Sequence, residues 1–341
     1  MKKLILIACL GFSGAVLGHH STLGFFDPTQ RIEIEGVLTA ITWANPHVRF
    51  EMDVTNEDGS VEGWHIETSA WSALRTRGLT QDFMQVGDRV RIAGPPSRDG
   101  SPEMNGRNVL LEDGTEVVMA LTAEPYFTDS AAGRLLEPIF DEDLEAAARR
   151  DADGIFRVWS TVIGDPDSFP MFKGDYPLTE AAEAVRAAWN PTADALLQCW
   201  EKGMPMIMIT PLPMAFERSG GDILIRFEED DAERLVHMGA NAPNATREPA
   251  HLGYSTGRWE NETLVVETTD ITALEFDDRG APQTPAIELE ERFTVSDDGN
   301  RLDYRLLISD PGTFAEDFDL TRYWVWRPEI VVGRWDCENP E

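Results

Sequence analysis

Histidines gather near the start of the sequence. Four of the six fall within the first 65 residues, namely His19, His20, His47 and His65. Imidazole nitrogens are common ligands of transition metals, and a carboxylate such as that of Glu67 can complete their coordination. A histidine at a free N-terminus adds a chelate, because its α-amine and its Nδ1 bind one ion together. With a second imidazole these groups form a three-nitrogen brace, which suits copper.

The brace requires removal of a leader segment. Residues 1–18 open with two lysines, continue with the uncharged apolar stretch Leu4–Gly18 and finish in small residues. This pattern is typical of a secretory signal peptide and is too short to span a bilayer. Cleavage after Gly18 would make His19 the first residue. We therefore expect an exported, periplasmic or secreted protein that binds copper through His19 and His47, with His20, His65 and Glu67 as further candidate ligands.

Two alternatives stay open at this stage. The Leu6–Cys9 stretch fits a lipobox, which would place a lipid on Cys9, but few apolar residues precede this cysteine and the apolar stretch continues beyond it. The ordinary signal peptide is therefore favoured. The histidines also have a simpler interpretation, in which the first pair lies in a solvated terminus and the second pair makes structural hydrogen bonds.

Two alternating segments would position the second pair of histidines. In His47–Val54 and in Val61–Thr68, apolar and polar residues alternate with the period of a half-buried strand. A turn signal over residues 56–60 predicts that the two strands form a hairpin. The pattern assigns to the buried face Val48, Phe50, Met52, Trp64 and Ile66. His47, His65 and Glu67 then share the opposite face.

The remaining elements predict a mainly β protein. Residues 19–119 read as short strands around one helix, which favours an OB-like β-barrel whose polar face would bind a ligand. Residues 120–203 form a partly helical connection. Residues 204–341 carry strands separated by turn signals, which predicts an antiparallel meander curled into a sheet or barrel.

Charge and missing motifs exclude several functions. The chain carries 61 acidic and 29 basic residues and a net charge of −32, which disfavours binding to nucleic acids and anionic membranes. The sequence contains no GxGxxG, no P-loop, no GxSxG and no HExxH motif, so dinucleotide and nucleotide-triphosphate enzymes are disfavoured. After the leader no stretch is apolar and long enough for a transmembrane helix. The partner is expected to be a metal ion or a small molecule, and the sequence names no protein partner.

The C-terminal half offers an alternative function. Arg258 and Arg292 could bind a substrate carboxylate, or they could pair with Glu260, Glu267 or Glu291 on neighbouring strands. Aromatic residues could line an apolar pocket or simply form a core, namely Tyr304, Tyr323, Trp324, Trp326 and Trp335. The alternatives to copper binding are thus the binding of a small apolar molecule, or a hydrolase or isomerase activity on one, and a structural or interaction protein without catalysis.

The two cysteines that remain after cleavage are Cys199 and Cys337. In an oxidising compartment an even number of cysteines predicts a disulfide, which would join these two. Two buried free thiols are the alternative. The sequence holds no CxxC motif and no cysteine–histidine cluster for a structural zinc site.

Several short motifs resemble an uncharacterised family of exported bacterial proteins, a domain of unknown function. The motifs are His19-His20-Ser21, Phe26-Asp27, Trp43-x-Asn45-Pro46-His47, Gly87-Asp88, Gly94-x-Pro96, Cys199…Gly203-Met204-Pro205, Gly257–Glu260, Thr263–Thr268, Glu291–Phe293, Asp310-Pro311 and Asp336–Glu338. The resemblance extends over nearly the whole mature chain. It implies export and keeps His19, His20 and His47 as named positions, but it carries no activity with it.

Overall fold

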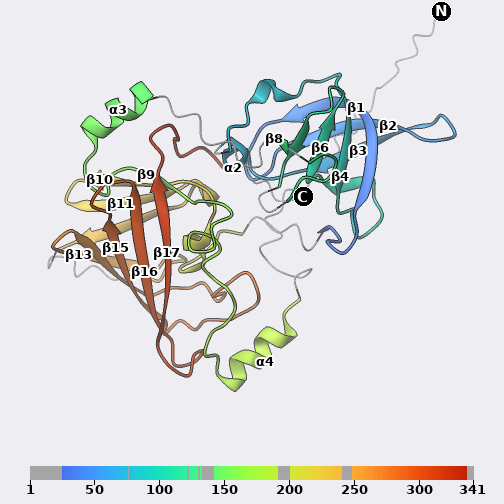
Figure 1. Cartoon of the computed structure of the whole chain (residues 1–341). Helices are drawn as coiled ribbons and strands as arrows, with labels where there is room; N and C mark the ends of the chain where they lie inside the picture. The colour runs from blue at the N-terminus through green and yellow to red at the C-terminus, as the bar shows by residue number, and fades with distance from the viewer. Residues whose placement is uncertain are drawn as a thin grey trace, which may run out of the picture.

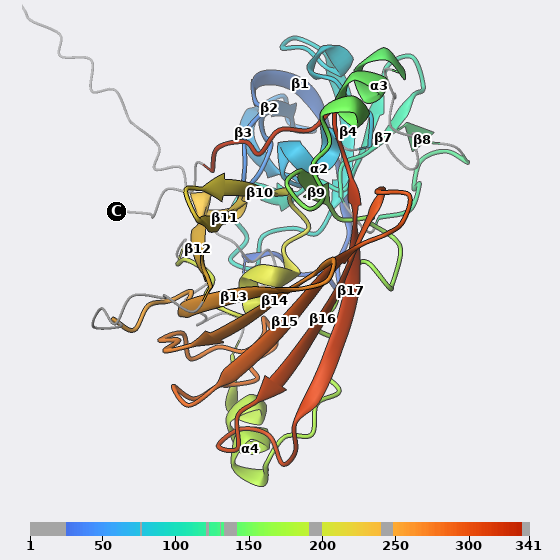
Figure 2. The same cartoon turned by 90° about the vertical axis from the view of Figure 1, so that its left-hand side faces the viewer.

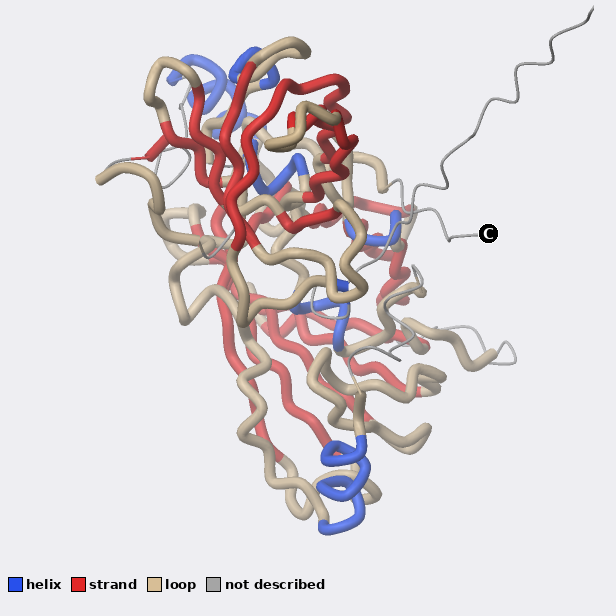
Figure 3. Tube along the Cα trace, turned by 90° about the vertical axis from the view of Figure 1, so that its right-hand side faces the viewer, coloured by secondary structure: helices blue, strands red, loops and turns tan. Residues whose placement is uncertain are grey.

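The computed structural model describes residues 25–75, 77–120, 123–129, 131–132, 142–190, 200–239 and 248–335. Strands dominate it, and the longer helices lie at its periphery (Figure 3). Figure 1 shows two β units, a smaller one built from the first third of the chain and a larger one built from the rest. The predicted mainly β fold is therefore confirmed. Among the described residues no helix is both long enough and apolar enough to cross a membrane.

The smaller unit is one curled sheet. Its strands are β1 (Ile32–Thr42), β2 (Arg49–Thr55), β3 (Val61–Glu67), β4 (Arg89–Gly94), β5 (Glu103–Asn105), β6 (Asn108–Leu111), β7 (Glu116–Val118) and β8 (Ala131–Ala132). They follow the order β5-β3-β2-β1-β4-β6-β7-β8. β5 and β6 are two parts of one interrupted segment, of which β5 runs parallel to β3 and β6 runs antiparallel to β4. This segment therefore joins both sides of the sheet, which gives the unit its OB-like form.

The β2–β3 hairpin forms as predicted, in one of the two registers that keep His47, His65 and Glu67 on one face. Glu51 lies opposite His65, and Arg49 lies opposite Glu67. The predicted inward residues Val48, Phe50, Met52 and Ile66 are buried, while Trp64 packs half-buried against the same core. The strict alternation of both segments restricted the register, because a slip of one residue would turn the apolar side chains to solvent.

Helices are few and short. In the smaller unit, α2 (Trp71–Arg75) is followed by the 3₁₀ turn η1 (Gln81–Phe83), so the helix expected over residues 69–79 is shorter than predicted. Gly78 has a φ of 80° and ends this region as expected of a cap. Two helices follow in the connection, α3 (Glu142–Asp151) and α4 (Glu180–Ala188).

The larger unit is a closed barrel (Figure 2). Its strands are β9 (Val158–Ser160), β10 (Met214–Ser219), β11 (Asp222–Phe227), β12 (Glu233–Met238), β13 (Tyr254–Glu260), β14 (Thr263–Thr269), β15 (Glu288–Val295), β16 (Arg301–Ser309) and β17 (Phe318–Trp326). All neighbours are antiparallel except β12 and β13. β9 closes the circle by pairing with both β10 and β17. The expected meander is thus confirmed, but its ninth strand comes from the preceding connection.

A plug fills part of the larger barrel. The 3₁₀ turn η4 (Met206–Ile209) is buried along its whole length and belongs to the same core as Trp159, Phe293 and Trp324. A second 3₁₀ turn, η5 (Glu229–Asp231), connects β11 to β12. The barrel interior is therefore packed with protein, as is usual for a barrel of this size.

Candidate functional site

His47 and Glu67 form a nearly buried pair at the end of the β2–β3 hairpin. His47 lies two residues before the start of β2, and Glu67 is the last residue of β3. The exposed fractions of the two residues are 9% and 8%. The Nε2 atom of His47 lies 3.1 Å from the Oε1 atom of Glu67. On the other side of the ring, Nδ1 lies 2.8 Å from the carbonyl oxygen of Thr68.

These contacts define the protonation of the pair. A carbonyl oxygen only accepts hydrogen bonds. Nδ1 of His47 therefore carries a proton and donates a hydrogen bond to the carbonyl oxygen of Thr68. Nε2 then faces the carboxyl group of Glu67, and two acceptors at this distance require a proton or a metal ion between them. Burial raises the pKa of Glu67, although the nearby His47 and Arg49 act in the opposite direction.

The other predicted ligands are placed differently. His65 is exposed and lies opposite Glu51, on the same face as Glu67 but farther from His47 along the strands. Among the described residues no group of three or more histidine, cysteine, aspartate or glutamate side chains lies close enough to hold a metal ion. His19 and His20 lie outside the described residues, as do Cys199 and Cys337.

Asn45 links this site to the larger barrel. It precedes His47 by two residues in the Trp43–His47 motif, and the structure describes the Asn45–Pro46 peptide bond as cis. Its Oδ1 atom accepts a hydrogen bond from the backbone N–H of Ser72 at 3.1 Å. Its Nδ2 atom lies 3.2 Å from Oε1 of Glu228, which belongs to the larger unit. Sequence reasoning noticed the motif but had no means of finding a partner 183 positions away.

Glu228 is fully buried where the two units meet. Its Oε2 atom accepts a hydrogen bond from the backbone N–H of Gly333 at 2.6 Å. Burial raises the pKa of this carboxyl group, while hydrogen bonds from Ser72 and Gly333 oppose the rise. The contact therefore joins Asn45, helix α2 and the segment after β17 around one carboxyl group.

A second group of polar residues lies inside the larger barrel. Arg234 on β12 donates to both carboxyl oxygens of Glu291 on β15, one of them at 3.0 Å. Its Nε atom donates to the hydroxyl of Ser255 at 2.9 Å, and Tyr304 donates to Oε1 of Glu291 at 2.9 Å. The side chains of Arg234 and Glu291 are only 1% and 0% exposed. Every donor and acceptor thus comes from strands of the same barrel.

The prediction for Glu291 needs a correction. The sequence suggested Glu291 as one partner of Arg258 or Arg292, but Glu291 points inward to Arg234. Neighbouring residues of a strand face opposite sides, so Glu291 cannot share the outer face with Arg292. Other predicted partners are confirmed, because Arg258 contacts Glu260 and Glu267. Arg292 also binds Glu260, at 2.7 Å. Leu289 and Phe293, two positions before and after Glu291 in β15, are apolar and point inward. Their pattern could have shown that Glu291 points inward as well.

Arg322 fixes the plug. This inward-facing residue of β17 donates to the carbonyl oxygen of Met208 and to the hydroxyl of Thr161, both at 2.7 Å. Its guanidinium carbon lies 4.4 Å from the ring centre of Trp324. Burial lowers the pKa of Arg322 to about 9. Because Trp324 is buried in the core, and Trp326 is nearly so, these two residues act here as packing residues.

An acidic corner surrounds Lys202, just before the plug. The Nζ atom of Lys202 lies 2.5 Å from Oε1 of Glu229, and its backbone N–H donates to Oδ2 of Asp230 at 2.8 Å. Burial, followed by repulsion from Glu229, raises the pKa of Asp230 to about 7. Burial also raises the pKa of Asp278 nearby. This corner therefore changes charge near neutral pH.

Comparison with known families finds a match to the first part of the chain, which includes β1 to β5 of the smaller unit. Residues 7–106 match a family model described as "Family of unknown function (DUF6152)". The match confirms, for this part of the chain, the expected similarity to an uncharacterised family. It includes His47, Glu67 and Asn45 but describes no activity for them. No curated protein matches the sequence.

Proposed function

We propose that this protein binds copper through His47, with Glu67 beside it and with His19 and His20 from the N-terminal segment. The observation that carries the proposal is the orientation of His47. Its Nδ1 donates to the Thr68 carbonyl, so the ring is held in the tautomer whose Nε2 can bind a metal. Metal-binding histidines are commonly oriented by such a bond from their second ring nitrogen.

The environment of the pair supports the same chemistry. The raised pKa of Glu67 means that the carboxyl group holds its proton more readily than in water. His47 and Glu67 would hold a copper ion through Nε2 and a carboxylate oxygen, and binding would release the proton of the carboxyl group. With the His19 amine and ring, the site would present three nitrogens and one oxygen, a set that suits Cu(II). His65 is a candidate for a more distant ligand on the same face.

The role that follows is metal handling or redox chemistry in an exported protein. Export is part of the proposal because the brace forms only after cleavage before His19. Sequencing the N-terminus of the protein recovered outside the cytoplasm tests this step. A first residue other than His19 would contradict the brace and would leave His47 and Glu67 as the whole described site.

The direct test measures Cu(II) affinity by competition with a weak chelator. The protein that begins at His19 is compared with the same protein carrying one additional residue before His19, which keeps both rings but removes the chelating amine. We expect the extended form and the variant His47→Ala to lose most of the affinity. His237→Ala is the matched control, because His237 contacts Asp222 on the larger barrel and is outside the proposed site.

The outcomes separate two levels of the proposal. Equal copper affinity of the two N-termini would contradict the brace. Equal affinity of His47→Ala and wild type would contradict the metal site altogether. The same conclusion would follow if neither the protein that begins at His19 nor the extended protein retained copper. Affinity should also fall below about pH 6, where imidazoles become protonated and the amine is harder to deprotonate.

A further inference from the structure

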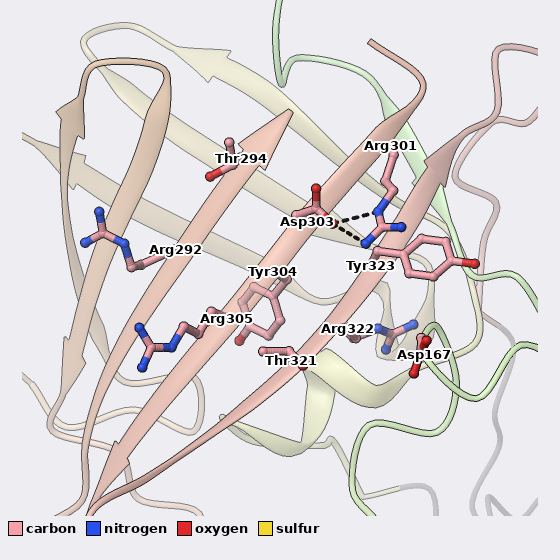
Figure 4. A pocket seen from close by; sticks show the side chains of 10 residues that line it. All are labelled: Asp167, Arg292, Thr294, Arg301, Asp303, Tyr304, Arg305, Thr321, Arg322 and Tyr323. Carbon is pink, nitrogen blue, oxygen red and sulfur yellow. Dashed lines mark hydrogen bonds and ion pairs between the residues drawn. The ribbon is translucent and has the colours of Figure 1, made fainter. Parts of the chain in front are cut away.

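A polar groove lies on the outer face of the larger barrel. It crosses strands β15, β16 and β17 and has a volume of about 540 Å³, which is within the range of small-molecule sites. Figure 4 shows the side chains that line it, all from these three strands except Asp167. Those that could meet a ligand are Arg292, Thr294, Asp303, Arg305, Thr321 and Tyr323.

Two arginines of the groove oppose each other directly. In the antiparallel pairing of β15 and β16, Arg292 is the partner of Arg305, and the partner of Arg305 on β17 is Thr321. Like charges at directly opposed positions of a sheet destabilise the pairing. In a chain with a net charge of −32, acidic side chains would have been the more abundant choice for either position. The repulsion between the two guanidinium groups must therefore be offset by anionic groups near them.

Each of these arginines already contacts acidic side chains. Arg292 donates from Nη2 to Glu260 on β13 at 2.7 Å, and its Nη1 lies 3.5 Å from Glu290 on β15. Arg305 donates from Nε to Asp319 on β17 at 3.0 Å. In the described part of the chain neither terminal nitrogen of Arg305 makes a hydrogen bond. Guanidinium groups carry several N–H donors in one plane, so each arginine can hold its own acid and still donate to a ligand.

One side of the groove is fixed by a stacked pair. The guanidinium carbon of Arg301 lies 4.1 Å from the ring centre of Tyr323, and Arg301 donates to Asp303 at 2.6 Å. Asp303 lies opposite Thr294, and this pair is two residues along the strands from the pair of Arg292 and Arg305. The carboxylate of Asp303 and the hydroxyl of Thr294 therefore face the groove next to the two arginines. Hydroxyl and carboxylate side chains in this position are suited to the hydroxyl groups of a ligand.

We propose that the groove binds a small hydroxylated carboxylate of the uronic-acid type. Its carboxylate lies between Arg292 and Arg305, and its hydroxyls contact Thr294, Thr321 and Asp303. Arginine forks match the planar carboxylate group. A doubly charged phosphate is disfavoured, because Glu260, Asp319 and Asp303 surround the arginines and would repel the second charge.

The test measures binding of sodium glucuronate by calorimetry or by ligand-observed NMR at low salt. Glucose and inorganic phosphate are the comparison probes. We expect glucuronate to bind most tightly, and Arg305→Gln to weaken its binding by roughly tenfold or more. Arg226→Gln is the matched control, because Arg226 is an exposed strand arginine of the same barrel that pairs with Glu217 and Glu233. Thermal melting of each variant checks that it is folded.

Each outcome bears on the proposal. Tight binding of glucuronate that is lost in Arg305→Gln and kept in Arg226→Gln supports it. Equal binding by both variants places the ligand elsewhere and overturns it. Absence of glucuronate binding at millimolar concentration, or glucose binding as tight as that of glucuronate, also overturns it. Tighter binding of phosphate contradicts the choice of a carboxylate.

Discussion

The two β units bury their ionisable groups in different places. In the smaller unit the core cluster is entirely apolar, and the buried carboxyl groups belong to terminal residues of strands, Glu67 at the end of β3 and Glu116 at the start of β7. In the larger barrel, Arg234 and Glu291 face each other across the interior. A carboxyl group at a strand end can bind loop N–H groups, as Glu116 does with Tyr126. A charge in the interior must find its partners on other strands, as Arg234 does, or on segments packed inside the barrel, as Arg322 does.

This difference has an energetic consequence. A buried ion pair is retained only if both partners are present, because removal of one leaves a charge without compensation in a medium of low polarity. The large barrel therefore depends on the match between Arg234 and Glu291. The smaller unit does not depend on an ionised Glu67, because burial already favours the neutral form of that carboxyl group.

The largest effect is expected for Glu291→Gln. The substitution keeps the shape of the side chain but leaves the buried guanidinium of Arg234 without a counter-charge. We expect the free energy of unfolding of the larger barrel to fall by about 3–5 kcal/mol. Urea denaturation measures this loss. The control is Glu290→Gln on the outer face of the same strand, where ion pairs with Arg258 and Arg292 are accessible to solvent and a loss below about 1 kcal/mol is expected. Similar losses for both variants would remove the distinction between interior and surface.

A smaller effect of the opposite sign is expected for Asp230→Asn. Burial raises the folded-state pKa of Asp230 to about 7, so the folded protein binds a proton more tightly than the unfolded chain. The wild type therefore loses stability as the pH rises from about 4 to about 7. The amide removes this ionisation, so the variant should be more stable at about pH 8, by at most about 4 kcal/mol. Chemical denaturation at both ends of the range measures the difference, which should be absent near pH 4. A variant that is less stable at pH 8 would show that the charged form of Asp230 is the favoured one.

The contact between the units is tested by Asn45→Ala. The substitution removes the acceptor for the N–H of Ser72 and the donor to Glu228, and we expect a loss of about 1–3 kcal/mol. Differential scanning calorimetry should also show that the unfolding transitions of the two units move apart. Asn56→Ala is the control, because Asn56 bonds only within an exposed turn. An unchanged calorimetric profile in Asn45→Ala would indicate that this contact does not couple the unfolding of the two units.

The smallest effect is expected for Glu67→Gln in metal-free protein. Because burial raises the pKa of Glu67, the wild type loses stability as the pH rises above the ordinary glutamate pKa of about 4.5. The variant should therefore be as stable as wild type in acid and slightly more stable at about pH 8. Denaturation curves at the two pH values measure this. A marked destabilisation at pH 8, as for Glu291→Gln, would show that the smaller unit also relies on a buried charge.

Local patterns explain most of what the sequence predicted. The alternation in residues 47–54 and 61–68 predicted the hairpin, the residues on each of its faces and the proximity of His47 to Glu67, but left two registers open. Three-residue strands such as β5 and β9 escaped prediction, because so few residues show no periodicity. Contacts between distant segments escaped it as well. Arg234 and Glu291 are 57 positions apart, and nothing in either segment alone identifies its partner.

The position of β9 has a consequence for the order of folding. Its residues Trp159 and Ser160 pair with Trp326 and Val325 near the end of the chain. The circle of hydrogen bonds is therefore incomplete until β17 has been made, and until then β9 and β16 each lack one neighbouring strand. The hairpin of β2 and β3 needs only residues that are close in the chain, so its loop-closure entropy is small. The smaller unit is thus able to fold before the larger barrel, whose closure needs β17.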